Sequence, residues 1–323
     1  MRREIPDVPP GHVRVRIAVS GVNATDWRSR SGQSTPLRFD EQVPHQDGAG
    51  VIDALAEDVT AFHEGQRVWL WDVAFGRPTG TAQEYTVVPA RHAVPLPAGI
   101  DLEHGAALGI PALTAHRALT TGAAPHLGPG MLAGRTILVH GGAGAVSHAA
   151  IQLAKWSGAT VVTTVSSRAK AELARQAGAD LVVDYKNEDV VARVLSVAPG
   201  GVDRIVEVDF GANHSVDAAV LAAGGIVGIY SYRTGDSVPV PSPEWLVTNA
   251  TISFVYTYTT AAPYKDAAIH DVNAALEARA LRIGAEHGLP LHRFTLENTA
   301  EAHEAVQGNT VGKVLVVVPE GRL

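Results

Sequence analysis

A glycine-rich turn is the feature of this sequence that points most clearly to chemistry. Gly141 and Gly144 lie in HGGAGAVSHAAIQLAK, between an apolar strand and an expected amphipathic helix. The first glycine permits a tight turn. The second leaves no Cβ where a pyrophosphate would approach the first amides of the helix, at Ala145 and Val146. Ser147 stands at the third position of the pattern, which usually holds Gly or Ala. We predict a dinucleotide site here, the alternative being a turn that joins strand to helix without a ligand.

The residues after the next apolar strand indicate which dinucleotide binds. An NAD site usually carries an acidic residue about 20 positions beyond the glycines, where it holds the ribose hydroxyl. This chain has Ser166, Ser167, Arg168 and Lys170 there, with no carboxylate before Glu172. Hydroxyl and cationic groups stabilise a 2′-phosphate, whereas a carboxylate repels it. We therefore expect NADPH, the alternative for the two cations being a solvated helix start.

The elements around this turn predict a doubly wound parallel sheet. From residue 136 to the strand IVGIYS, five apolar strands alternate with helices. The preceding residues, 14–89, alternate in the way typical of short strands of a β-barrel. The segments after residue 256 are too few to fold alone, so we expect them to return to the barrel. The predicted domains are a catalytic domain of residues 1–111 and 257–323 and an inserted nucleotide domain of residues 112–256.

Composition excludes several classes of protein. Of the 323 residues, 46% are hydrophobic, which suffices for two buried cores. The net charge is −7 and the basic residues are scattered, so we expect no nucleic-acid partner. No apolar stretch reaches the roughly 20 residues of a membrane span, and the first ten residues do not resemble a secretory signal, so we expect a cytoplasmic protein. The absence of cysteine removes thiolate-based zinc sites, and the 14 histidines are dispersed, so we expect no metal.

Seven stretches carry a likeness to a known family: GVNATDWRSRSG, VPHQDGAGVIDAL, TAFHEGQRVW, AQEYTVVP, LGIPALTAHRAL, VHGGAGAVSHAAIQLAK and GKVLVVV. In these residues the chain resembles the zinc-lacking quinone oxidoreductase and zeta-crystallin branch of the medium-chain dehydrogenase/reductase superfamily. The resemblance implies a GroES-like catalytic domain, a Rossmann domain and a cofactor in the cleft between them. Relatives usually carry an extra strand pair before the segment REIPDVPPG, so we expect either a trimmed barrel or a late start.

The resemblance also implies roles for individual residues. The family's 2′-phosphate contacts would fall on Lys170 and Tyr185, with Ser166 beside them, and Thr114 would lie near the nicotinamide. Relatives form dimers through the last strand of the nucleotide domain, here ATISFVY, so we expect a homodimer. The remaining expected cofactor contacts are Gly228, Tyr230, Ser231 and Lys313.

The same comparison indicates the reaction. Zinc-dependent members read GHE where this chain reads HQD, so Gln46 takes the place of a ligand histidine. Alcohol dehydrogenation needs a Lewis acid, whereas a quinone or α,β-unsaturated carbonyl accepts hydride when hydrogen bonds stabilise the charge on its oxygen. We predict an NADPH-dependent reductase of such a small molecule. The alternatives are an enoyl reductase of a biosynthetic pathway and a non-catalytic NADPH-binding or sensing protein.

Two residues of the segment NATD are the candidates for catalysis. Asn23 could donate a hydrogen bond to the substrate carbonyl, and Asp26 could position water or a neighbouring group. The alternative is that both cap a helix, since Asn and Asp are favoured there. Trp27 replaces a tyrosine of some relatives and cannot act as an acid. A flat substrate pocket or ordinary core packing would account for the aromatic residues Trp69, Trp71, Phe75, Tyr256 and Tyr258.

Overall fold

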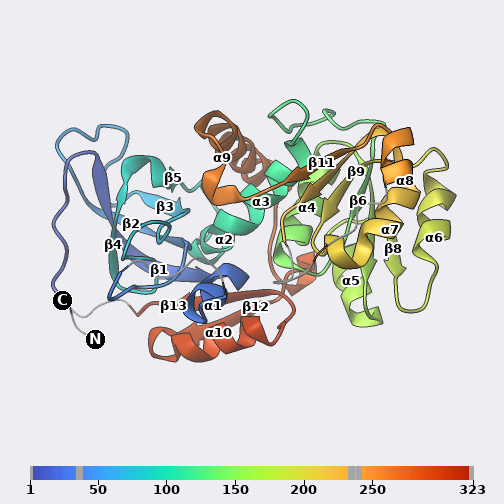
Figure 1. Ribbon diagram of the computed structural model, residues 1–323. Helices are drawn as coiled ribbons and strands as arrows, with labels where there is room; N and C mark the ends of the chain where they lie inside the picture. Colours follow the sequence, from blue (N-terminus) through green and yellow to red (C-terminus); the bar gives the residue numbers. More distant parts are fainter. Residues whose placement is uncertain (1–2, 34–38, 232–236, 238–241, 320–323) are drawn as a thin grey trace. The chain divides into compact units, whose positions relative to one another are not determined.

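The computed structural model describes residues 3–33, 39–231, 237 and 242–319, and these form two compact units (Figure 1). Unit 1 comprises Met1–Ile110 and Leu291–Leu323, and unit 2 comprises Pro111–Pro290. The second break thus follows residue 290 rather than residue 256, which corrects the predicted boundary. Helix α9 (Ala262–Glu277) belongs to unit 2 because its Asp271 accepts hydrogen bonds from other residues of that unit, the His116 ring and the Leu127 amide.

Unit 1 is built on one sheet of seven strands in the order β12, β13, β1, β2, β3, β5, with β4 also paired to β1. Alternation along β1 directs Val13, Val15 and Ile17 into the core. The strands are β1 (His12–Val22), β2 (Asp47–Leu55), β3 (Arg67–Leu70), β4 (Tyr85–Pro89), β5 (Ala93–Pro95), β12 (Leu291–Thr295) and β13 (Lys313–Val317). Its helices are α1 (Ala24–Arg30), α2 (Leu102–Ala106) and α10 (Thr299–Gln307), with short 3₁₀ turns at Ala90–His92 and Leu296–Asn298.

Unit 2 contains a parallel sheet of six strands in the order β11, β10, β9, β6, β7, β8. The strands are β6 (Thr136–Val139), β7 (Thr160–Val165), β8 (Leu181–Asp184), β9 (Val202–Glu207), β10 (Leu221–Ile229) and β11 (Thr251–Phe254). The chain order reverses between β6 and β9, as in a Rossmann fold, where dinucleotides bind outside the carboxyl ends of the strands. The predicted doubly wound sheet joined to a GroES-like barrel is confirmed.

Helices of unit 2 begin where the sequence supplies helix-capping residues. The Ser167 side chain accepts a hydrogen bond from the amide of Lys170 and opens α5, and Asp189 does the same for Ala192 in α6. The helices are α3 (Gly109–Thr120), in whose first turn the unit boundary falls, α4 (Ala145–Trp156), α5 (Arg168–Gln176), α6 (Val190–Val197), α7 (Phe210–Val220), α8 (Ser242–Val247) and α9, with 3₁₀ turns at Thr257–Thr259 and Ala285–His287. Among the described residues, none of these helices is long and apolar enough to cross a membrane.

Candidate functional site

The glycine-rich turn follows β6 at the switch point and leads into α4. Gly141 has φ +69°, a conformation that favours glycine, and Gly144 is the N-cap residue of α4. A Cβ added at Gly144 would meet no atom closer than 3.4 Å, so the protein itself does not need that space. A Cβ at Gly142 would instead overlap the Thr163 side chain. The structure therefore assigns Gly142 to packing and leaves Gly144 free to face a ligand.

The side chain of Ser147, in the first turn of α4, holds the glycine-rich turn in place. Its side chain is buried, and its hydroxyl donates a hydrogen bond of 2.8 Å to the carbonyl oxygen of His140. The same hydroxyl lies 3.2 Å from the hydroxyl of Tyr230, which follows β10. Burial raises the pKa of Tyr230, so this phenol stays protonated. Ser147 thus replaces the usual small residue with one that ties two loops of the site together.

A buried group of titratable side chains under the turn was not anticipated from the sequence. Nε2 of His140 lies 2.9 Å from Oδ1 of Asp217 and 3.5 Å from Oε2 of Glu207. Burial lowers the pKa of His140, but Asp217 and Glu207 together raise it above its ordinary value. Burial raises the pKa of Glu207 to about 7. His140 directly follows β6, and Glu207 is the last residue of the adjacent strand β9. Their positions at the carboxyl ends of neighbouring strands are the feature of the sequence that could have predicted this group.

The rim after β7 carries the predicted cations and hydroxyls. Nζ of Lys170 donates a hydrogen bond of 3.1 Å to Oγ of Ser166, and Arg168 is exposed at the first position of α5. The amide of Tyr185 donates to the carbonyl oxygen of Val165 at 3.1 Å, which brings the exposed Tyr185 beside Ser166. The structure therefore gathers Ser166, Lys170 and Tyr185 at one edge of the sheet.

The other predicted cofactor residues of unit 2 are placed in different ways. Ala145 and Val146 form the first turn of α4, where backbone amides are free to meet an anion. Thr114 is buried in α3, and Ser231 is half-buried beyond β10. A Cβ at Gly228 would overlap the backbone of Ala118, so this glycine serves the close approach of β10 to α3.

A buried polar cluster in unit 1 contains both catalytic candidates. Nδ2 of Asn23 donates to Oδ2 of Asp47 at 2.6 Å, and Oδ1 of Asn23 accepts from Nζ of Lys313 at 2.7 Å. Oδ2 of Asp26 accepts the backbone amide of Asn23 at 2.7 Å, which caps α1. The other oxygen of Asp47 accepts the amide of Ile110 at 2.8 Å. Lys313, predicted at the cofactor, lies in this cluster, where Asn23 and Asp47 surround its ammonium.

Burial is the largest influence on the pKa values of the ionisable groups in this cluster. It raises the pKa of Asp26 to about 8 and that of Asp47 to about 6, the latter against the opposing effect of Lys313. It lowers the pKa of Lys313. Asp26 is therefore mostly protonated at neutral pH.

The segment HQD, where zinc-dependent proteins carry a ligand, makes internal contacts in this chain. Oε1 of Gln46 accepts the amide of Ala74 at 3.0 Å. Nε2 of His45 lies 2.8 Å from Nε2 of His303, and Nδ1 of His45 lies 2.7 Å from the hydroxyl of Ser20.

Of the aromatic candidates, Trp69 and Trp71 are core residues, whereas Phe75 and Tyr256 are exposed and Trp27 and Tyr258 are half-buried.

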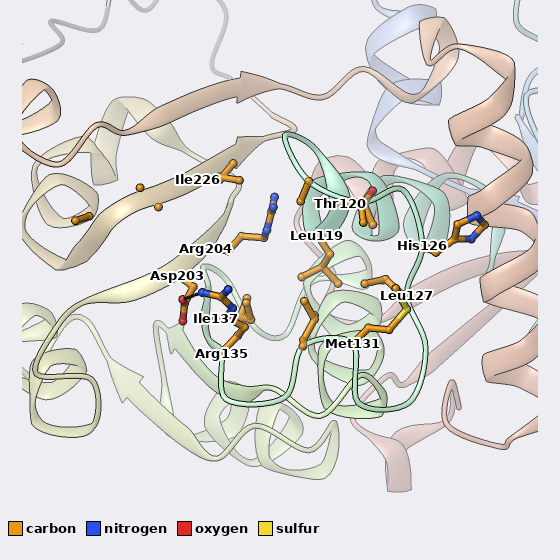
Figure 2. Close-up of a pocket in the computed structure, with 16 residues that line it drawn as sticks. Leu119, Thr120, His126, Leu127, Met131, Arg135, Ile137, Asp203, Arg204 and Ile226 are labelled. Carbon is orange, nitrogen blue, oxygen red and sulfur yellow. Dashed lines mark hydrogen bonds and ion pairs between the residues drawn. The ribbon is translucent and has the colours of Figure 1, made fainter.

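A cavity of about 290 Å³ in unit 2 lies away from the glycine turn (Figure 2). Ile137 and Arg204 line it near the amino ends of β6 and β9, opposite the carboxyl ends where nucleotides bind. The guanidinium of Arg204 donates a hydrogen bond of 3.0 Å to the carbonyl oxygen of Ala118. This cavity is therefore separate from the dinucleotide site.

Comparisons with known proteins agree with this geometry. Residues 9–98 match the family "Alcohol dehydrogenase GroES-like domain" and residues 145–278 match "Zinc-binding dehydrogenase". Quinone oxidoreductase of Rattus norvegicus is 29% identical over 316 residues, which cover 96% of this chain and 90% of the relative. A solved NAD-dependent alcohol dehydrogenase is 25% identical with a TM-score of 0.84, over 99% of this chain and 95% of that one. A mycobacterial protein solved with NADPH is 25% identical with a TM-score of 0.81, over 98% of this chain and 94% of that one.

Proposed function

We propose that this chain, which belongs to the quinone oxidoreductase branch of the medium-chain dehydrogenase/reductase superfamily, reduces a quinone or an α,β-unsaturated carbonyl with NADPH. The chain is an oxidoreductase that uses a nicotinamide dinucleotide. The cofactor supplies the hydride, and the residues of the chain bind and orient it. The known fold accommodates both NAD and NADPH, so the choice between them depends on the residues of this chain.

The rim after β7 is the observation that carries the choice of NADPH. Lys170 and Ser166 lie within 3.1 Å of each other where an NAD site would carry a carboxylate. The nearest acidic residue of α5, Glu172, lies 3.4 Å from Arg175 and is paired with it. A 2′-phosphate at this rim would receive hydrogen bonds from a hydroxyl and an ammonium.

The residues at the ligand positions of zinc-dependent relatives support a reaction without metal. The chain has no cysteine, and the side-chain oxygen of Gln46 already accepts the Ala74 amide. A quinone or enone needs only hydrogen bonds to its carbonyl oxygen to accept hydride. Asn23 and Asp26 are fully engaged within unit 1, so we assign them to positioning the end of β1 and the start of α1.

The test is NADPH oxidation followed by absorbance. The purified chain should oxidise NADPH when 1,2-naphthoquinone or a 2-alkenal is added, with the rate unchanged by EDTA. NADH should support the same reaction with a much higher KM. NADPH binding without any substrate-dependent loss of absorbance would overturn the proposal and favour the sensing alternative.

We extend the proposal to a homodimer formed through β11, which lies at one end of the parallel sheet. Phe254 on this strand is 80% exposed, and Leu246 and Val247 of the preceding helix are each 76% exposed. An edge strand bordered by large apolar side chains is suited to pairing with a second copy. Sedimentation should give a dimer for the native chain and a monomer for Phe254→Glu. A native monomer at micromolar concentration would contradict this extension.

A further inference from the structure

Two histidines and an aspartate converge at the surface of unit 2. Nδ1 of His126, in the loop after α3, lies 3.2 Å from Oδ1 of Asp271 in α9. Nδ1 of His270, the preceding residue of α9, lies 2.9 Å from the same oxygen. Each of the three residues thus offers one ligand atom, and these atoms all lie within 4.8 Å of one another. Figure 2 shows the side chain of His126 directed toward α9.

Hydrogen bonds to its second oxygen hold the carboxylate of Asp271 in place. Its second oxygen accepts a hydrogen bond from Nε2 of His116 at 2.8 Å and from the amide of Leu127 at 2.7 Å. The residue is only 2% exposed, so these contacts fix the direction in which the first oxygen points. A carboxylate whose second oxygen is held by hydrogen bonds resembles the way proteins orient a metal ligand.

Access from solvent distinguishes this group from an ordinary buried network. The His126 side chain is 51% exposed and that of His270 is 77% exposed, so neither imidazole needs the aspartate to satisfy its nitrogen atoms. Exposed side chains can also shift by a few tenths of an ångström without disturbing the core. The observed separations of 3.2 and 2.9 Å are close to the roughly 3.3 Å between ligands of a tetrahedral zinc ion with bonds of about 2.0 Å.

We propose that His126, His270 and Asp271 bind one divalent transition-metal ion of the Zn²⁺ or Cu²⁺ class, with solvent completing its coordination. Two imidazoles and one carboxylate are the donor set that these ions prefer, whereas Ca²⁺ and Mg²⁺ require oxygen ligands. The ion would join the loop after α3 to α9, because one ligand comes from the loop and two from the helix. This site is distinct from the proposed reductase activity, which uses other residues and no metal. The sequence predicted no metal site because His126 is separated from His270 by more than 140 residues.

Titration of the EDTA-treated full chain with ZnCl₂ in a calorimeter tests the proposal. One ion should bind per chain with a dissociation constant in the micromolar range or below. His126→Ala and His270→Ala should each weaken binding at least tenfold, while the exposed His63→Ala in unit 1 should leave it unchanged. Zinc should also raise the Tm of the native chain and of His63→Ala, but not that of the first two variants.

Electron paramagnetic resonance of the Cu²⁺-loaded chain provides the second measurement. Nitrogen couplings from two imidazoles should appear in the native chain, and each alanine variant should show one. Binding weaker than the micromolar range, or micromolar binding that both variants retain, would overturn the proposal. Either result is independent of NADPH oxidation, which is measured in EDTA.

Discussion

Nζ of Lys313 donates a hydrogen bond of 2.7 Å to Oδ1 of Asn23, although 290 positions separate the two residues in the chain. Nδ2 of the same side-chain amide donates a hydrogen bond to Asp47, so Asn23 bridges a buried ammonium and a buried carboxylate. Lys313 opens β13, and Asn23 follows β1, the strand that pairs with β13. The first and last strands of unit 1 along the chain, β1 and β13, are therefore joined by this side-chain hydrogen bond as well as by their backbone pairing.

Lys313→Met should destabilise the protein by about 3–5 kcal/mol, because it removes one partner of a buried charge pair and leaves Asp47 uncompensated. Urea unfolding measures this change. Lys186→Met, at an exposed lysine, is the control and should change the free energy of unfolding by less than about 0.5 kcal/mol. Similar values for both variants would mean that the ammonium of Lys313 stabilises nothing in the native state.

Asp26 should make the free energy of unfolding fall as pH rises from its ordinary pKa of 3.8 to its folded pKa of about 8. Its pKa is about 8 in the folded protein, against an ordinary value of 3.8, so the native state holds a proton that the unfolded state has lost. The resulting stability is fully present below the unfolded pKa and is lost as pH rises through about 8, at up to about 1.4 kcal/mol per pH unit.

Asp26→Asn removes this titration and keeps an oxygen that can accept the Asn23 amide. Between pH 6.5 and 8, the free energy of unfolding of the variant should therefore fall less steeply than that of the native chain. Urea unfolding at several pH values measures both slopes, with the exposed Asp7→Asn as control. Parallel slopes for native chain and Asp26→Asn would show that Asp26 is ionised in the folded protein.

The strand and helix pattern of unit 2 was predictable because its strands are buried on both faces. Runs such as TVVTTV therefore stand out in the sequence, and β7 occupies residues 160–165 as expected. The boundary near residue 256 was not predictable. The Ala-rich α9 shows no preference for either unit in its sequence, and its place depends on the contacts of Asp271 with His116 and Leu127.

Local motifs also predicted only part of the candidate site. The order of residues around Gly141 and Gly144 identified the turn, because a pyrophosphate requires that spacing locally. The group of His140, Glu207 and Asp217 comes from three separate segments, so no short pattern encodes it. Lys313 could be recognised at the start of a strand, but its partner Asn23 is known only once the sheet brings β13 beside β1.

Two neighbouring glycines of the turn should separate stability from cofactor binding. Gly142→Ala places a Cβ against Thr163 and should lower the free energy of unfolding by about 1–3 kcal/mol. Gly144 has φ −82°, and a Cβ there would make only ordinary van der Waals contacts, so Gly144→Ala should cost no more than the roughly 1 kcal/mol of an alanine at an N-cap. Its methyl group would nevertheless occupy the expected position of the pyrophosphate.

Fluorescence titration with NADPH measures the second effect of this pair. Gly144→Ala should bind NADPH at least tenfold more weakly than the native chain, and cooperative urea unfolding of the variant is its control for folding. Native affinity in Gly144→Ala would place the pyrophosphate away from the start of α4.

Lys170→Ala should change the preference between the two nicotinamide dinucleotides. Loss of a hydrogen bond to a charged phosphate costs about 1.5–3 kcal/mol, so the KM for NADPH should rise about tenfold to a hundredfold. NADH carries no 2′-phosphate, so its KM should stay within about a factor of two of the native value, and Lys186→Ala should alter neither constant. Steady-state kinetics with a fixed concentration of 1,2-naphthoquinone measure both. An equal rise for the two cofactors would reject the rim formed by Ser166 and Lys170 as the phosphate site, since a general loss of binding affects them alike.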